Sequence, residues 1–497
     1  MITMIKRHMM LQFSLGFLLM LSCGSESSFT EMMPEPEPTS GDVTLYVTSG
    51  YRIQEFKKTY LNFSANDNLS PNTLFLDPQQ TYQTMDGFGA AITGSSAYNL
   101  LKMSAADRTK FLKETFSTTE GMGQSYVRIA IGCSDFSLSE YTLNDKPGIE
   151  NFALQKEELE YVIPVMKEIL AINPDIKVMG SPWTAPLWMK VNNLQERAPY
   201  TSWTGGHLNP AHYQDYGTYF VKWIQAMEAQ GIRIHSITPQ NEPLNHLNSA
   251  SMVMKWEEQR DFIKQALGPK LRGAGLQTKI YAYDHNYNYD NMADQQSYPV
   301  RIYEDAEASQ YIAGAAYHNY GGDRSELLDI HAKAPDKELI FSETSIGTWN
   351  NGNVLSTQLI ADMREVGLGT INNWSRGVIV WNLMLDADRG PTREGGCLTC
   401  YGAVDIDSDY RTIKKNSHYF VVGHLSAVVK SGAVRIGSKG KTPEGIIHSA
   451  FRNPDNSFAI VLANSNSVDT SVTFSDGDKH FTHIVPANSV VSYQWSK

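Results

Sequence analysis

Eight short apolar runs recur through the middle of the chain, and most of the intervals between them are long enough to hold a helix. Two of these intervals, 156–170 and 213–230, show the apolar spacing of an amphipathic helix. Eight successive strand–helix units close most naturally into a barrel, so we predict an α/β fold with a (β/α)₈ TIM barrel. The runs lie at 85–91, 126–132, 176–181, 234–238, 279–284, 312–318, 338–343 and 377–382.

The two flanks of this region have a different pattern. Residues 43–76 and the chain beyond 418 show short apolar runs punctuated by Asn, Asp, Ser and Gly, which predicts β-strands. We expect these N-terminal and C-terminal strands to form one appended β-sandwich, which could bind glycans, although structural support is the commoner role. The predicted divisions are 1–22 as a signal peptide, 23–40 as a tether for a lipid anchor, 41–80 as N-terminal strands of the β-sandwich, 81–416 as the catalytic barrel and 417–497 as the C-terminal β-sandwich.

The N-terminus has the order of an export signal. Two basic residues precede an apolar run at 9–21, which ends at Ser22 and Cys23. A small residue directly before a cysteine resembles a bacterial lipobox, in which Cys23 is lipidated; a plain signal peptide with an incidental cysteine is the alternative. The acidic, proline-rich segment 34–38 predicts a stiff tether. We therefore expect an exported protein that is lipid-anchored to the bacterial envelope, at the outer membrane, the cell surface or the periplasmic face.

The charge of the chain limits its partners. A formal net charge of -11, with no run of Lys or Arg, argues against nucleic acid or anionic lipid as the main partner, because binding phosphates needs a concentrated basic face. An oligo- or polysaccharide substrate fits better, and we expect a monomer whose membrane association comes from the lipid anchor. The sequence has no dinucleotide-binding context and no phosphate-binding loop, so we predict no metal and no organic cofactor.

Two glutamates stand where apolar runs end. Residues 234–241 lead to Glu242, and residues 338–342 lead to Glu343. Residues at this place in a barrel strand point into the cleft at the C-terminal face. One glutamate alone would more often form a salt bridge or face solvent. Two carboxylates on two strand ends are what glycoside hydrolysis requires, because one protonates the leaving oxygen while the other attacks the sugar or activates water.

Further polar and aromatic residues have the same placement. A buried arginine needs a carboxylate partner, so Arg128 could keep Glu343 ionised by lowering its pKa, unless it only braces the barrel. Trp183 and Trp381 are candidates for the floor of a sugar site, although each could equally belong to the core. The histidine that ends the sixth strand and the tyrosine just beyond it could bind sugar hydroxyls or be satisfied inside the barrel wall. The candidate substrate-binding residues are Arg128, Asp135, Trp183, Asn241, His318, Tyr320, Trp381 and Asn382.

The cysteines are too few for a disulfide scaffold. Cys397 and Cys400 form a C-x-x-C pair in the last barrel loop, which could be a disulfide staple, a redox site or half of a metal site. We favour the staple, because there is no second cysteine pair and no thioredoxin-like context. Cys133 has no obvious partner and is expected to be a buried free thiol.

Five motifs occur in a fixed order at 86–93, 127–128 with 133–137, 181–186, 240–243 and 342–343. They resemble glycoside hydrolase family 30, and the likeness continues through 381–383 and 417–426 towards the C-terminus. The resemblance implies a retaining β-glycosidase with Glu242 as acid/base and Glu343 as nucleophile. It also implies that the candidate substrate-binding residues other than Asn382 line the subsite that holds the non-reducing sugar.

The family includes lysosomal glucocerebrosidase and microbial β-1,6-glucanases. The resemblance therefore favours an endo-β-1,6-glucanase that acts through a covalent glycosyl-enzyme. Glucosylceramidase, or an exo-acting β-glucosidase or β-xylosidase, is the alternative within the family. A non-catalytic glycan-binding surface lipoprotein is the alternative from another class, and the presence of both carboxylates argues against it. Retention requires carboxyl groups about 5–5.5 Å apart, a raised pKa for Glu242 and an ionised Glu343.

Overall fold

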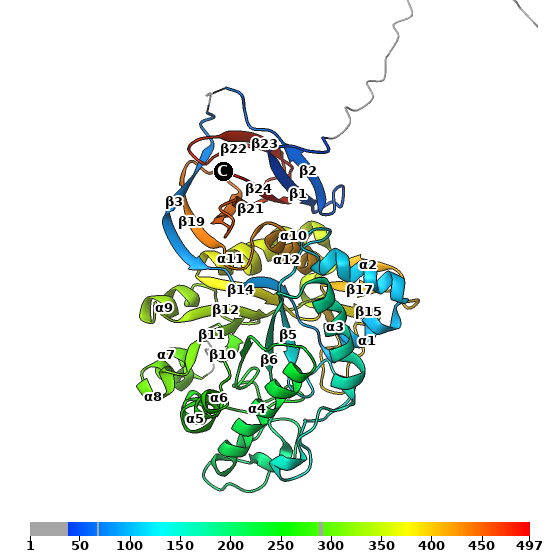
Figure 1. The fold of residues 1–497 in the computed structure, drawn as a ribbon, viewed down its shortest axis with the longest axis vertical. Coiled ribbons are helices and arrows are strands. Elements are labelled where there is room, and N and C mark those ends of the chain that lie inside the picture. The colour runs from blue at the N-terminus through cyan, green and yellow to red at the C-terminus, as the bar shows by residue number, and fades with distance from the viewer. Residues whose placement is uncertain (1–37, 67–68, 288–291) are drawn as a thin grey trace, which may run out of the picture. The chain divides into compact units, whose positions relative to one another are not determined.

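The computed structural model describes residues 38–66, 69–287 and 292–497 (Figure 1). The predicted signal peptide, the lipidation residue Cys23 and most of the predicted tether lie outside the described residues. Within the described part of the chain, no helix is both long enough and apolar enough to span a membrane.

Eight parallel strands form the sheet at the centre of the larger domain (Figure 1). Their order is β4-β14-β12-β11-β10-β9-β6-β5, and a parallel bridge between Ala91 and Arg128 connects the two ends. The sheet is therefore the closed barrel that the eight apolar runs predict. The strands are β4 (Gly87–Ala90), β5 (Tyr126–Ala130), β6 (Lys177–Ser181), β9 (Ser236–Ile237), β10 (Lys279–Asn286), β11 (Ile312–His318), β12 (Glu338–Glu343) and β14 (Ser375–Val380).

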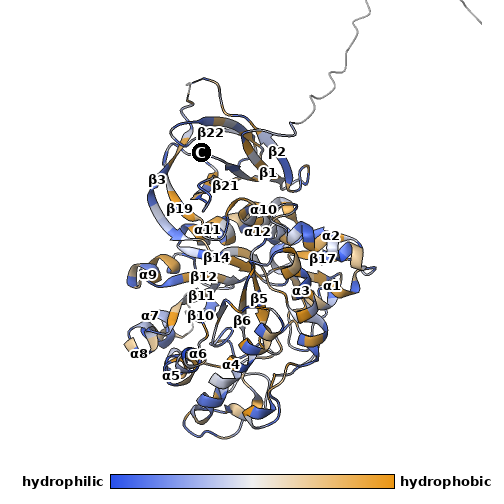
Figure 2. Ribbon diagram, in the orientation of Figure 1, coloured by the Kyte–Doolittle hydropathy of each residue, from blue (hydrophilic) through white to orange (hydrophobic). Residues whose placement is uncertain are grey.

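Helices cover the outside of this barrel, and most show both apolar and polar residues (Figure 2). Helix α4 buries Tyr216, Phe220 and Trp223, which are three or four residues apart and share one face. Gly180 in β6 leaves room for the Trp223 ring, because a Cβ there would lie 2.2 Å from it. The helices are α1 (Gly94–Lys102), α2 (Ala105–Phe116), α3 (Ile163–Ile172), α4 (Tyr213–Ala229), α5 (Trp256–Phe262), α6 (Gly268–Gly273), α7 (Tyr298–Tyr303), α8 (Ala306–Ser309), α9 (Glu326–Lys333), α10 (Leu355–Asp362) and α11 (Leu368–Asn372).

A layer of buried side chains fills the barrel interior below the strand ends. Tyr126 lies two residues before Arg128 in β5, and Ile340 lies two residues before Ser342 in β12, so each pair points to the same side of its strand. The interior is thus packed towards the N-terminal ends of the strands, and polar residues follow towards the C-terminal ends. The layer consists of Tyr126, Met179, Tyr281, Ala316, Ile340 and Ile379.

The smaller domain is a nine-stranded sheet of order β2-β1-β24-β21-β20-β19-β3-β22-β23. It combines strands from both ends of the described chain. The N-terminal strand β1 pairs with the C-terminal strand β24, and the N-terminal strand β3 lies between β19 and β22. The sheet curls over its own core, where Phe481 of β23 contacts Trp495 of β24. The strands are β1 (Val43–Ser49), β2 (Lys57–Leu61), β3 (Thr73–Thr84), β19 (Val434–Gly440), β20 (Ile446–Arg452), β21 (Phe458–Asn464), β22 (Thr470–Ser475), β23 (His480–Val485) and β24 (Ser489–Trp495).

Helix α12 (Ser417–Val428) lies in a segment that we expected to begin the β-sandwich. Every residue of the helix is buried. Its His424 ring nitrogens lie 2.7 Å from Ser492 Oγ and 2.8 Å from Thr48 Oγ1, and so connect it to β24 and β1. A helix that is buried all round has no one-sided apolar pattern, which explains why its sequence did not predict a helix.

Candidate active site

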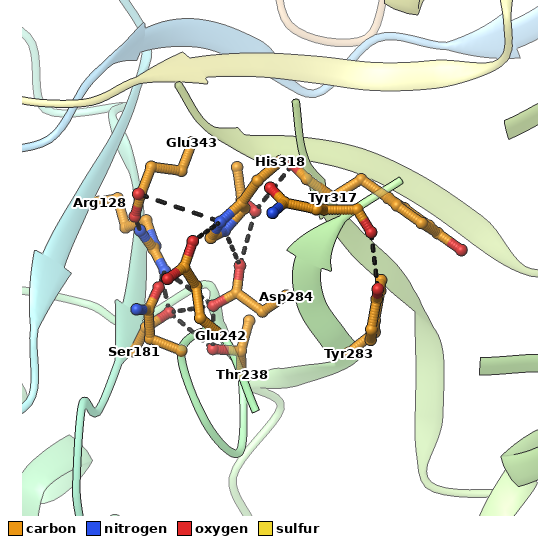
Figure 3. A network of polar contacts seen from close by, with 12 residues as sticks. Arg128, Ser181, Thr238, Glu242, Tyr283, Asp284, Tyr317, His318 and Glu343 are labelled. Carbon is orange, nitrogen blue, oxygen red and sulfur yellow. Dashed lines mark hydrogen bonds and ion pairs between the residues drawn. The ribbon is translucent and has the colours of Figure 1, made fainter. Parts of the chain in front are cut away.

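Glu242 and Glu343 face each other at the C-terminal end of the barrel (Figure 3). Glu343 is the last residue of β12, and Glu242 follows β9 in a turn with a φ of 45°. The Glu242 N–H donates to the Asp284 carbonyl at 2.9 Å and fixes this left-handed turn. One oxygen of each carboxylate and one ring nitrogen of His318 all lie within 4.8 Å of one another.

A cavity of about 420 Å³ opens beside this pair. Five residues predicted for the catalytic pair and the sugar site lie on its wall: Asp135, Glu242, Tyr320, Glu343 and Trp381. The cysteines of the predicted staple also line it. The wall further includes residues that the sequence did not single out, namely Asn245, Asn248, Asn286, Ser345 and Trp349.

Arg128 connects Glu343 on one side of the site with Asp284 on the other (Figure 3). Its guanidinium is fully buried, donates to Glu343, and donates at 2.7 Å to both Asn241 Oδ1 and Asp284 Oδ2. The same group lies over the rings of Trp183 and Trp381, at 5.1 and 5.4 Å from their centroids. Arg128 therefore pairs with Glu343, as predicted, and also with a second carboxylate.

Asp284, two residues before the end of β10, is the carboxylate that the sequence did not single out. It accepts hydrogen bonds from Thr238 Oγ1 at 2.7 Å and Ser342 Oγ at 2.6 Å, besides the contacts with Arg128 and His318. Burial would raise the pKa of Asp284, but Arg128 and His318 outweigh burial and hold this pKa well below its usual range. Asp284 is thus a permanent anion that orients the arginine and the histidine.

His318 lies between three carboxylates (Figure 3). Its Nε2 is 3.0 Å from Asp284 Oδ1, and its Nδ1 is 3.4 Å from Glu242 Oε1 and 4.0 Å from Glu343 Oε1. Burial would lower the pKa of His318, but Glu343, Asp284 and Glu242 raise it to about 9. Both ring nitrogens then donate to carboxylate oxygens, and protonated His318 and Arg128 supply the positive charge that these carboxylates need.

The protonation of the glutamates differs from the sequence-based expectation. Burial would raise the pKa of Glu242, but His318, together with the Asn245 amide 2.7 Å away, lowers it to about 2. Burial raises the pKa of Glu343, although His318 and Arg128 oppose this rise. His318 therefore carries a proton 3.4 Å from Glu242, and the three groups titrate as one set. The reason is the close approach of His318, which the sequence does not show.

The remaining predicted sugar-site residues divide between the cavity wall and the layer behind it. Trp381 is on the wall, and Trp183 stacks behind it with ring centroids 5.1 Å apart. Tyr320 donates from its hydroxyl to Glu343 Oε1 at 3.1 Å. Asp135 is half-buried, but its Oδ1 is buried and unpartnered, and burial of the carboxyl near both glutamates raises its pKa to about 8. This carboxyl can donate a hydrogen bond to a sugar hydroxyl.

Asn382 lies behind the cavity wall. Its side chain is fully buried, and its Oδ1 accepts a hydrogen bond from Thr93 Oγ1 at 2.8 Å. Its backbone has a φ of 45°, which turns the chain after β14. We predicted direct substrate binding by Asn382, whereas its contacts fix the first barrel loop to the last.

The loop after β14 carries the bonded pair Cys397 and Cys400. Its Arg393 donates to the Ser134 carbonyl at 2.8 Å and to Glu140 Oε1 at 2.9 Å, and so attaches this loop to the one after β5. Cys133 is a buried free thiol, and burial raises its pKa to about 12. The disulfide thus belongs to the cavity wall, and the free thiol does not.

We expect Arg128→Met to destabilise the chain strongly, because it leaves Asp284 and Glu343 as uncompensated buried carboxylates. Removal of one partner from a buried ion pair costs about 3–5 kcal/mol. Urea denaturation measures the loss, and Arg411→Met, at an exposed position, is the control. A loss as small as that of the control would mean that the Arg128 network does not stabilise the fold.

The pKa of His318 predicts a pH-dependent stability. Because this pKa rises from 6.5 to about 9, the protonated ring stabilises the fold fully below pH 6.5, and the contribution is lost as the pH rises through 9. We expect His318→Gln to cost on the order of 3 kcal/mol near pH 6 and much less above pH 9. Urea titrations at the two pH values measure both costs. Equal costs would show that His318 is neutral in the folded chain.

A closed (β/α)₈ barrel that presents two facing carboxylates, a cavity of sugar size and a buried arginine at its C-terminal end defines a glycoside hydrolase. Comparison with known families agrees with this class. The model of the glycosyl hydrolase family 30 TIM-barrel domain matches residues 85–429, and that of the family 30 beta sandwich domain matches residues 432–493. The chain belongs to glycoside hydrolase family 30.

Individual relatives support this assignment. The endo-1,6-beta-D-glucanase of Neurospora crassa is 31% identical over 433 residues, which are 84% of this chain and 86% of the relative. The lysosomal acid glucosylceramidase of Mus musculus is 27% identical over 500 residues, covering 96% of this chain and 93% of the relative. A solved endo-beta1,6-glucanase matches with a TM-score of 0.91 and 63% identity, over 92% of this chain and 100% of that structure.

Proposed function

We propose that this chain is a retaining endo-β-1,6-glucanase, with Glu343 as nucleophile and Glu242 as acid/base. The observation that supports retention is the approach of the two carboxylates, whose nearest oxygens lie within 4.8 Å. An inverting enzyme needs about 6.5–9.5 Å between its carboxyl groups to admit a water molecule, whereas a retaining enzyme uses about 5–5.5 Å. The pair therefore fits direct attack on the sugar by one of the two groups.

The contacts of each glutamate favour one order of events. Arg128 and Tyr320 hold Glu343, and the remaining lone pairs of its carboxylate can attack the anomeric carbon. Glu242 protonates the departing oxygen, and the proton comes from His318 at 3.4 Å. Water then enters, Glu242 removes its proton, and the glycosyl–Glu343 ester is cleaved with retention. Binding of the sugar excludes water and lets Asp135 donate to a hydroxyl.

The substrate assignment rests on the solved endo-beta1,6-glucanase that is 63% identical to this chain. The shape of the site supports endo action. A second hollow of about 320 Å³ shares Tyr320, Ser345 and Trp349 with the cavity beside the glutamates. A site that continues past the cleavage point can accept the interior of a polysaccharide, whereas exo action needs a closed end.

A product time course on linear β-1,6-glucan tests this proposal. We expect a ladder of oligosaccharides at early times, and none with Glu343→Gln. Glucose alone from the start would contradict endo action and favour an exo-β-glucosidase. Cleavage of glucosylceramide or of a β-xyloside without cleavage of the glucan would contradict the linkage. Binding of the glucan with no product from any of these substrates would leave a glycan-binding surface protein.

We also propose that Cys23 is lipidated and anchors the protein to the bacterial envelope. The support is the apolar run at 9–21 followed by Ser22 and Cys23. Expression with radiolabelled palmitate in a bacterial host should label the wild type and bring it to the membrane fraction. Cys23→Ser should abolish both the label and the membrane association, while Cys133→Ser keeps them. Equal labelling of wild type and Cys23→Ser would contradict the anchor.

A further inference from the structure

Two large exposed apolar side chains line the cavity, and two more lie next to lining residues in the sequence. Leu247, Tyr320, Trp349 and Leu398 are 75%, 43%, 54% and 68% exposed. Tyr320 and Trp349 line the cavity, while Leu247 lies between the lining residues Asn245 and Asn248 in sequence, and Leu398 lies between the two bonded cysteines. A group of exposed apolar side chains around one opening is typical of a binding site.

Trp349 is the largest of these side chains, and its backbone is firmly placed. It lies in the turn Thr348–Asn350 directly after β13 (Ile346–Gly347), which pairs with β16 (Cys400–Tyr401). Thr348 also donates from its N–H to the Thr399 carbonyl at 2.9 Å. The turn is therefore attached to the loop that the Cys397–Cys400 disulfide closes.

The Trp349 ring rests against the backbone of Gly347. A Cβ at Gly347 would lie 1.9 Å from Cζ3 of the ring, so only glycine allows this position. The ring and the disulfide both line the cavity that contains Glu242 and Glu343. The ring also borders the second hollow, towards which a bound chain would continue.

We propose that Trp349 is the stacking platform for the sugar on the leaving-group side of the cleaved bond, and that Gly347 and the Cys397–Cys400 loop position it. This inference rests on the proposed function. On the cavity wall, Trp381 is 2% exposed and Asp135 is half-buried with a buried Oδ1, so this inner part of the cavity suits the sugar that Glu343 attacks. The departing sugar lies further out, where Trp349 offers an exposed ring face. Aromatic rings stack on the apolar face of a glucose unit and tolerate its hydroxyls at the edge.

Two substrates allow binding on the leaving-group side to be measured separately from binding in the rest of the site. A β-1,6-gluco-oligosaccharide places sugars on both sides of the cleaved bond, whereas gentiobiosyl β-fluoride loses only fluoride. We expect Trp349→Ala to lower kcat/KM on the oligosaccharide at least about tenfold, which corresponds to the roughly 1.4 kcal/mol expected of one aromatic stacking contact. On the fluoride the same variant should stay within about twofold of wild type. Trp349→Phe should recover most of the loss.

The positioning role of the loop has its own readout. We expect the double variant Cys397→Ser/Cys400→Ser to raise KM on the oligosaccharide with little change on the fluoride, and thiol reduction of the wild type to give the same pattern. Ile484→Ala, at an exposed position on β23, is the matched control and should change neither substrate.

Equal losses on both substrates with Trp349→Ala would place the ring on the other side of the cleaved bond and overturn the proposal. An unchanged kcat/KM on the oligosaccharide would overturn it as well. Failure of the wild type on both substrates would instead contradict the proposed function.

Discussion

Replacement of Glu343 by Gln is expected to lower kcat on β-1,6-glucan by about 10⁵-fold, because the amide cannot form the glycosyl-enzyme ester. Glu343 is the carboxylate that Arg128 and Tyr320 hold beside the cavity. Initial rates from reducing-sugar release measure the loss. Glu258→Gln is the matched control, because Glu258 is also buried but lies outside the cavity and contacts His207. Its rate should remain within about twofold of wild type.

Azide distinguishes a nucleophile from a residue that is only required for folding. Glu343→Gly leaves space on the side from which Glu343 attacks, so azide with an activated β-glucoside should give the α-glycosyl azide. Recovery of the β-glycosyl azide from this variant would contradict the assignment of Glu343 and would exchange the roles of the two glutamates.

Replacement of Glu242 by Ala is expected to lower kcat/KM on β-1,6-glucan by about 10²–10⁴-fold, the usual contribution of a general acid. A sugar alcohol is a poor leaving group and needs the proton, whereas dinitrophenolate does not. We therefore expect the loss on a dinitrophenyl β-glucoside to be much smaller than on the glucan. Steady-state kinetics on the two substrates measure the difference.

Cleavage of the glycosyl-enzyme, the second half of the reaction, provides a control for the role of Glu242. In Glu242→Ala, azide should attack the glycosyl-enzyme and give the β-glycosyl azide, because the configuration is inverted twice. Asn245→Ala removes only a hydrogen bond to Glu242 and should cause a much smaller loss on the glucan. Equal losses on both substrates with Glu242→Ala would show that Glu242 does not act as the acid.

The fold and the catalytic pair could be predicted from the sequence because both depend on a local pattern. β11 and β12 begin and end where the apolar runs do, and Glu343 occupies the last position of its strand. Asp284 lies two residues before the end of β10 and is the last residue of the apolar run 279–284, and this position was the signal that could have identified it. A polar residue after a buried run thus carried most of the information about the site.

The site features that the sequence did not predict depend on contacts between distant segments of the chain. Asn245, Asn248 and Trp349 lie on loops without a periodic pattern, so only the folded chain shows that they reach the cavity. The lowered pKa of Glu242 depends on the 3.4 Å between His318 and Glu242, which come from different parts of the chain. Asn382 could not be separated from the wall residues because its partner Thr93 is far away in sequence.

The configuration of the first product tests the central claim most directly. ¹H NMR during hydrolysis of a β-1,6-gluco-oligosaccharide at high enzyme concentration resolves the two anomers before they interconvert. Glu343 and Glu242, with oxygens within 4.8 Å of each other, predict that the β-anomer appears first and that the α-anomer grows only by mutarotation. Appearance of the α-anomer first would contradict the double displacement and the roles of both glutamates.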